Sequence, residues 1–161
     1  MRSERGPGTV AGTHRESPAP PVAVMGRHGG AAWLCPLDRR ELRQALLAMC
    51  AAAASCGRPV AGVELYLITD ADMAGANAGH LGCMGPTNVL SFPGGPGMAG
   101  TLLLSPDTLE RECLLYGQEP TEHLLRLLAH GMGHLAGLDH GPEMDALCAA
   151  CEEAAEAGLA Q

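Results

Sequence analysis

One stretch near the C-terminal end, residues 127–140 with the sequence LLAHGMGHLAGLDH, constrains the chain more than any other. His130 and His134 are four residues apart, so on a helix they lie about 40° and one turn apart, and both imidazoles can reach one metal ion. His140 follows six residues later and in an unbroken helix would point about 120° away. The chain must therefore turn after His134, and Gly137 stands where a glycine can end a helix in the left-handed conformation. The spacing predicts two ligands on a helix and a third brought back by a glycine turn.

Three neutral imidazoles suit Zn²⁺ and leave a fourth coordination position open for water, which is typical of catalytic rather than structural zinc sites. Such an ion lowers the pKa of bound water and polarises a carbonyl or phosphoryl oxygen. We therefore predict one zinc ion per chain, held by His130, His134 and His140. The helix also has a separate apolar face for packing, formed by Leu124, Leu127, Leu128, Met132 and Leu135.

The same spacing occurs in metzincin proteases, whose pattern HExxHxxGxxH has a glutamate after the first histidine. That glutamate is the general base, whereas this chain has Gly131, which cannot take a proton. A metallopeptidase is therefore only a lower alternative. His123 lies about 10 Å along the helix from His130 and is predicted to face solvent. A fourth ligand from the loop residues His80 or Cys83 is the less favoured alternative.

Strand and helix signals alternate along most of the 161 residues, a length that fits one domain. Residues 63–69 alternate apolar and polar side chains as a half-buried strand does. Asp38 predicts the start of a helix that reaches Ser55, and Asp70 predicts the cap of a short helix at 71–78. We expect an α/β (α+β) fold, a single small domain with a mixed, mostly parallel sheet of about four strands and surrounding helices.

Three further short strands and three further helices complete the prediction. The strands are expected at 22–25, 89–92 and 101–105, a loop at 79–86, and the helices from Pro106, from Pro120 to about Ala136, and from Pro142. Residues 1–21 are aperiodic and rich in Gly, Pro and Ser. They are predicted to be a disordered N-terminal tail, followed by the domain at 22–161.

The charge of the chain is −8 and is unevenly placed. Residues 1–44 have seven arginines and four acidic residues, whereas residues 45–161 have three arginines and fourteen acidic residues. The acidic body argues against tight non-specific nucleic-acid binding, and no DNA partner is expected. The chain has no apolar run long enough for a membrane span and no secretory signal pattern, so no membrane partner is expected. With seven cysteines read as reduced thiols, we predict a cytoplasmic protein.

Two motifs resemble those of the YbeY family of bacterial metal-dependent endoribonucleases and rRNA maturation factors. The family pattern HGxLHLxGYDH stands here as HGMGHLAGLDH at 130–140, and PTDVLSFP stands as PTNVLSFP at 86–93. The strand VELYLITD followed by Asn77, and the segment 102–106, fit as well, so the resemblance covers roughly residues 60–147. It implies a small mixed sheet, zinc held by the three histidines, single-stranded RNA as substrate, and work on the small ribosomal subunit.

The chain departs from the family pattern in the loop before PTNVLSFP, which is basic in the family. The family arginine implicated in RNA cleavage falls on Leu81, and the aspartate of PTD is Asn88. Asn88 and Ser91 are candidates to line the site, and Asp139 is a candidate to accept a hydrogen bond from a ligand histidine.

Two functional hypotheses from different classes follow from the resemblance and its departures. The first is a zinc-dependent, single-strand-specific endoribonuclease acting in 16S rRNA 3′-end maturation and ribosome quality control. The second is a small-subunit assembly factor with weak or no nuclease activity, because a phosphodiester substrate needs positive charge that this loop lacks.

Overall fold

The computed structural model describes residues 19–26 and 34–161. Residues 1–18 of the predicted tail lie outside this range. The carbonyl of Pro21, the last residue of that predicted tail, accepts a hydrogen bond from the Val63 amide at 3.0 Å. Among the described residues, no helix combines the length and apolar character needed to cross a membrane.

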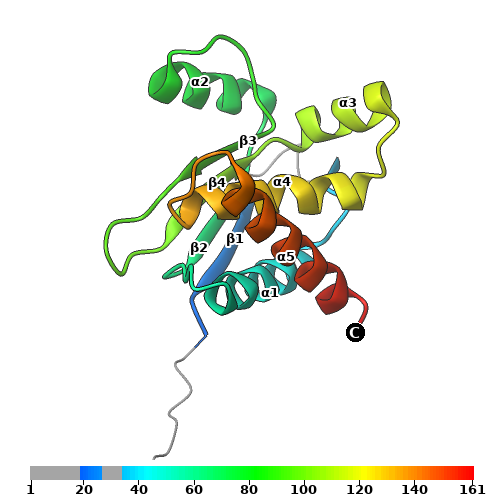
Figure 1. Ribbon diagram of the computed structural model, residues 1–161. Coiled ribbons are helices and arrows are strands. Elements are labelled where there is room, and N and C mark those ends of the chain that lie inside the picture. The colour runs from blue at the N-terminus through cyan, green and yellow to red at the C-terminus, as the bar shows by residue number, and fades with distance from the viewer. Residues whose placement is uncertain (1–18, 27–33) are drawn as a thin grey trace, which may run out of the picture.

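A four-stranded sheet in the order β1-β2-β4-β3 forms the centre of the fold (Figure 1). The strands are β1 (Val22–Gly26), β2 (Val63–Leu67), β3 (Val89–Phe92) and β4 (Gly100–Leu104). The pairs β1–β2 and β2–β4 are parallel, and β3 is antiparallel to β4. The prediction of a mixed, mostly parallel sheet is confirmed, and β3 is an edge strand of the described sheet.

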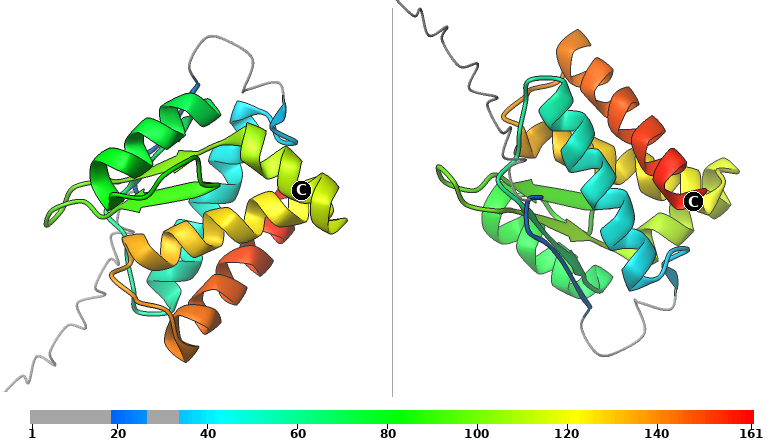
Figure 2. Two further views of the ribbon diagram at one scale, coloured as in Figure 1. Left: turned by 90° about the horizontal axis from the view of Figure 1, so that it is seen from above. Right: turned by 90° about the horizontal axis from the view of Figure 1, so that it is seen from below.

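The described part of the chain has five helices: α1, α4 and α5 lie on one side of the sheet, α2 lies on the other, and α3 packs against α4 (Figure 2). They are α1 (Arg39–Ser55), α2 (Asp70–Leu81), α3 (Pro106–Tyr116), α4 (Pro120–Leu135) and α5 (Pro142–Leu159). Helices α1 and α4 pack on one face of the sheet, and α5 packs across both of them on that side. Helix α2 covers the opposite face near β3, and α3 packs against α4.

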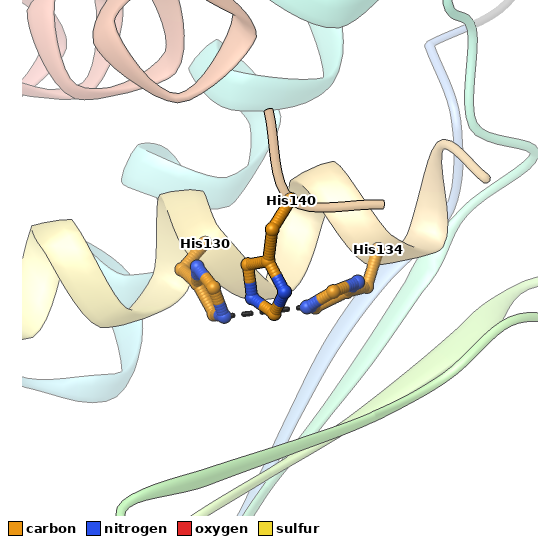
Figure 3. A group of neighbouring side chains, drawn as sticks. All are labelled: His130, His134 and His140. Atoms are coloured by element: carbon orange, nitrogen blue, oxygen red, sulfur yellow. Dashed lines mark hydrogen bonds between the residues drawn. The ribbon is translucent and has the colours of Figure 1, made fainter. Parts of the chain in front are cut away.

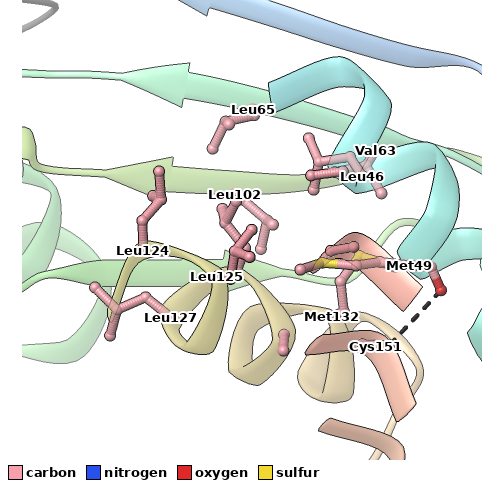
Figure 4. Packing of buried hydrophobic residues seen from close by; sticks show 14 of the residues in the cluster. Leu46, Met49, Val63, Leu65, Leu102, Leu124, Leu125, Leu127, Met132 and Cys151 are labelled. Carbon is pink, nitrogen blue, oxygen red and sulfur yellow. Dashed lines mark hydrogen bonds between the residues drawn. The ribbon is translucent and has the colours of Figure 1, made fainter. Parts of the chain in front are cut away.

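The main hydrophobic core lies between the sheet and helices α1, α4 and α5 (Figure 4). Leu46 and Met49 of α1, Leu65 and Leu102 of the sheet, and Leu124 of α4 are completely buried in it. A second, smaller cluster under α2 contains Ile68, Met73 and Leu90. The apolar face predicted for the helix of the histidine motif therefore packs inward and leaves the histidine-bearing side free.

Helix starts follow the capping chemistry of the sequence in most places. Asp38 forms a capping box with Glu41, in which each side chain accepts from the other residue's amide at 2.8 Å. Such a cap contributes about 1 kcal/mol. Ser105 caps α3 in the same way by accepting from the Thr108 amide. The predicted starts of α1 and α3 are thereby confirmed.

The predicted start of α2 is wrong by one residue, and its end is wrong by three. Thr69 is the N-cap and accepts from the Asp72 amide, while Asp70 is the first helical residue. Asp70 instead reaches α3, where its carboxylate accepts hydrogen bonds from Ser105 and Thr108 at 2.7 Å. The helix ends at Leu81. Residues 79–81 are therefore helical rather than part of the expected loop.

Candidate metal centre

His130 and His134 project from adjacent turns of α4, and His140 returns from the following turn to face both (Figure 3). The Nε2 atoms of His130 and His134 are 3.2 Å apart. One ligand atom from each of the three residues lies within 4.8 Å of the others. Two nitrogens that each lie about 2.1 Å from a tetrahedral zinc ion are about 3.4 Å apart. His130 and His134 already have this spacing, and the ligand atoms of the three-His cluster would have to draw closer together to share a single ion.

The turn after α4 is a Schellman motif, which explains how His140 reaches the cluster. Gly137 has φ +80°, its amide donates to the His134 carbonyl at 2.9 Å, and the Leu138 amide donates to Gly133 at 3.1 Å. A left-handed residue is needed at this point, and glycine adopts that conformation without steric penalty. Leu138 is buried and anchors the returning chain. The sequence prediction of a glycine turn between the second and third ligands is confirmed.

Local contacts keep the imidazoles in the form that binds metal. The Nδ1 atom of His134 lies 3.1 Å from the Leu138 carbonyl, which makes Nδ1 the donor and leaves the Nε2 lone pair facing the cluster. Burial, followed by the neighbouring His134 and His140, lowers the pKa of His130. This shift favours the neutral imidazole, which is the form that can bind a metal.

The cluster opens into a cleft of about 440 Å³ between α4 and β3. Its lining residues are Leu81, Val89, Leu90, Ser91, Phe92, Pro93, His130, His134, Gly137, Leu138 and Asp139. Because the residues at 89–93 line it consecutively, the cleft runs along the edge of β3 rather than along one face of the strand. Among these lining residues none is Lys or Arg, and Asp139 is the acidic one.

The three candidate supporting residues occupy different places. Ser91 and Asp139 line the cleft. Asp139 was expected to accept a hydrogen bond from one of the ligand histidines; His134 donates to the Leu138 carbonyl rather than to Asp139. Asn88 is outside the cleft lining. Its Nδ2 donates to Glu112 at 3.1 Å and its Oδ1 accepts from the following amide at 2.7 Å, so it holds the start of β3 against α3.

His123 was predicted to face solvent, but it is buried. It is 8% exposed, and its Nε2 lies 2.7 Å from the Glu112 carboxylate of α3. The spacing along α4 alone could not show that α3 covers this part of the helix. His80 and Cys83 are not members of the metal-binding group found among the described residues. The His80 ring packs against Phe92 with centroids 4.9 Å apart.

Gly131, between the first two ligands, is pressed against the sheet. A Cβ atom at this position would lie 2.7 Å from Cδ2 of Leu102 and 3.3 Å from Oγ of Ser91. A side chain here would therefore collide with the sheet before it could reach the cluster. This tight approach explains the glycine and shows that a glutamate here, as in the metzincin pattern, would require Leu102 to shift.

Comparison with known proteins places this geometry in a family. The family model described as "Endoribonuclease YbeY" matches residues 36–155. The chain belongs to the YbeY family. Curated YbeY endoribonucleases of Nitratidesulfovibrio vulgaris and Oleidesulfovibrio alaskensis are 46% and 41% identical to it. The first alignment covers 78% of this chain and 89% of the relative, and the second covers 77% and 86%.

A solved structure shows the same fold. The solution structure of TM1509 from Thermotoga maritima superposes with a TM-score of 0.59 over 84% of this chain and 89% of that protein. Its sequence identity is 21%, so the likeness speaks for the fold alone. The comparison with this structure therefore adds nothing about the three-His cluster, the β3 edge or the glycine turn.

Proposed function

We propose that this protein is a zinc-dependent, single-strand-specific endoribonuclease that acts in 16S rRNA 3′-end maturation and ribosome quality control in the cytoplasm. The observation that carries the proposal is the three-His cluster open to a cleft in a chain of the YbeY family. Its expected partners are single-stranded RNA and the small ribosomal subunit or its proteins.

The residues of the cleft divide the work between holding an ion and holding substrate. His130, His134 and His140 would hold one zinc ion, which when bound supplies Lewis-acid activation of water or of a phosphoryl oxygen. Ser91 offers a hydroxyl donor to a phosphate oxygen, and Asp139 offers an acceptor to a ribose hydroxyl or to water.

Zinc content and RNA cleavage together test the proposal. We expect the purified protein to contain about one zinc per chain and to cut a single-stranded RNA but not the same sequence in a duplex. His130→Ala and His134→Ala should lose both zinc and cleavage. His80→Ala removes a histidine outside the cluster and should keep its zinc. Equal cleavage by the parent and by His130→Ala would exclude the metal site from the reaction.

One observation favours a second candidate function, that of a small-subunit assembly factor with weak or no nuclease activity. The cleft lining has no cationic side chain to grip a phosphate or to offset charge in the transition state. Sedimentation with small ribosomal subunits separates the two functions. The assembly factor predicts that His130→Ala still sediments with the subunit and supports its maturation, whereas the nuclease predicts binding without maturation.

A metallopeptidase stays the lower alternative. Gly131 has no carboxylate, and a glutamate in its place would require Leu102 to shift. Hydrolysis of casein that a chelator abolishes would favour this alternative over both others.

A further inference from the structure

The wall of the cleft opposite the histidines is apolar and partly open to solvent. It consists of Leu81 at the end of α2 together with Phe92 and Pro93 at the end of β3, which we call the apolar wall. Leu81 is 61% exposed, although a leucine gains free energy by leaving water. An exposed apolar surface that adjoins a candidate reaction centre is typical of a ligand-binding surface.

The apolar wall is held rigidly in place from behind. The Phe92 ring meets the His80 ring edge-on, with centroids 4.9 Å apart and planes at 63°. It also packs against the buried cluster under α2, which contains Met73 and Leu90. Helix α2 is in turn tied to α3 through Asp70. A surface fixed in this way can receive a flat ligand without first being ordered, which favours binding.

On its other side, His130 borders a groove whose negative charge repels a polyanion. This groove of about 530 Å³ adjoins the cluster between α4 and α5. Its lining residues are Arg126, His130, Asp145, Cys148, Ala149, Glu152, Glu153 and Glu156. Four carboxylates against one guanidinium repel phosphates, so a nucleic-acid strand that reaches the cluster is directed toward β3 and the apolar wall.

We propose that the apolar wall of Leu81, Phe92 and Pro93 is a nucleobase subsite, which holds one base of a single-stranded RNA beside the three-His cluster. This inference rests on the proposed function and specifies how its substrate is held. The lining has no Lys or Arg, so the affinity that the apolar wall supplies comes from contact with the base face rather than from pairing with phosphates. Contact with a base face is tolerant of sequence, so the subsite selects unstacked strands rather than a particular base.

Removal of the bases from the ligand tests the proposal without altering the protein. The first probe is a uridine strand of about eight nucleotides, which is 2′-O-methylated so that it is not cut. The second is an abasic strand of equal length. Fluorescence anisotropy with the full chain should show at least about tenfold weaker binding of the abasic strand. Equal affinity for the two strands would overturn the subsite.

A variant of the wall gives a second, independent readout. Phe92→Leu keeps an apolar side chain but removes the aromatic face, and we expect about fivefold to tenfold weaker binding of the uridine strand. Binding of the abasic strand should stay unchanged, because that strand makes no base contact. If Phe92→Leu weakens both strands equally, the residue acts on the fold and the subsite assignment is wrong.

A charge introduced at the wall completes the test, with a matched control on α3. Leu81→Arg should steepen the slope of log affinity against log salt concentration by about 0.7, the value for one added phosphate contact on a single strand. Leu114 is also an exposed leucine, 79% accessible, but lies outside the cleft lining. Leu114→Arg should leave the slope unchanged, and an equal slope change in both variants would overturn the placement.

The outcomes distinguish this inference from the proposed function. If the protein cuts single-stranded RNA but binds the abasic strand equally well, the subsite is wrong and the nuclease stands. If the protein neither cuts nor binds the RNA, both are wrong.

Discussion

The glycine turn that returns His140 to the cluster can be tested by adding one methyl group. Gly137 has φ +80°, and a Cβ at this position meets no atom within 4 Å. Gly137→Ala therefore perturbs only the backbone conformation, not the packing. A residue with a Cβ in the left-handed region costs about 1 kcal/mol relative to glycine. For a chain of this size, that loss lowers the melting temperature by about 2–4 °C.

The chain offers a matched control at the end of α1. Gly57 has φ +73°, an equally open Cβ position, and the same pair of turn hydrogen bonds, from its own amide to Ala54 and from Arg58 to Ala53. Gly57→Ala should therefore lower stability by a similar amount. This turn carries no metal ligand, so its effect on zinc binding should be nil.

The two variants should differ in zinc affinity, measured by competition with a fluorescent chelator. Without metal, Gly137→Ala relieves its strain by displacing the turn, and zinc binding must then restore the turn. Restoring the turn would reduce the free energy of zinc binding by up to about 1 kcal/mol, which corresponds to a Kd about fivefold weaker. Unchanged zinc affinity in Gly137→Ala, together with its loss of stability, would refute the coupling between the turn and the site.

Three further predictions concern contacts outside the turn. Burial raises the pKa of Asp70, but hydrogen bonds from Thr108, Ser105 and Arg111 and the charge of Arg111 outweigh it, so the folded pKa lies below the usual value. Asp70→Asn should then lose about 2 kcal/mol of stability at neutral pH, and in acid-unfolding curves this difference should disappear as the pH falls through the folded pKa. Asn88→Asp should cost about 1–2 kcal/mol of folding stability and lower the melting temperature by several degrees. The reason is that a carboxylate would replace the amide that donates to Glu112. A melting curve that matches the parent's would contradict this. Exposed Cys83 should react with a thiol reagent within the mixing time. Cys151 is buried, and burial, followed by nearby charged groups, raises its pKa to about 12. It should therefore react only on unfolding.

Local signals in the sequence were sufficient for most of the fold and for the convergence of the three histidines. Asp38, Ser105 and the alternation along β2 act within a few residues, so their effects can be predicted from spacing. The convergence of His130, His134 and His140 could be predicted for the same reason, because a helical turn and a glycine determine where the rings point.

The errors arose where a side chain finds its partner on another element. His123 is buried because Glu112 of α3 lies against it, and no spacing along α4 reveals that contact. Asp70 was read as a local cap, yet its hydroxyl partners are more than thirty residues away in the chain. Asn88 looked like a site residue from its motif, but its side chain is engaged with α3. Such pairings depend on tertiary packing, which a single sequence does not display.

The close packing of α4 constrains His130 and His134 more tightly than His140. Gly131 and Gly133 let this helix approach so closely that an added Cβ would lie within 3 Å of Leu102 or Met144, so the helix can neither slide nor rotate. His140 is exposed and lies outside the helix, in the short segment between buried Leu138 and the start of α5. An ion leaving the centre would thus be released first by His140, and the rate of metal exchange would be governed by motion of that short segment rather than by opening of the domain.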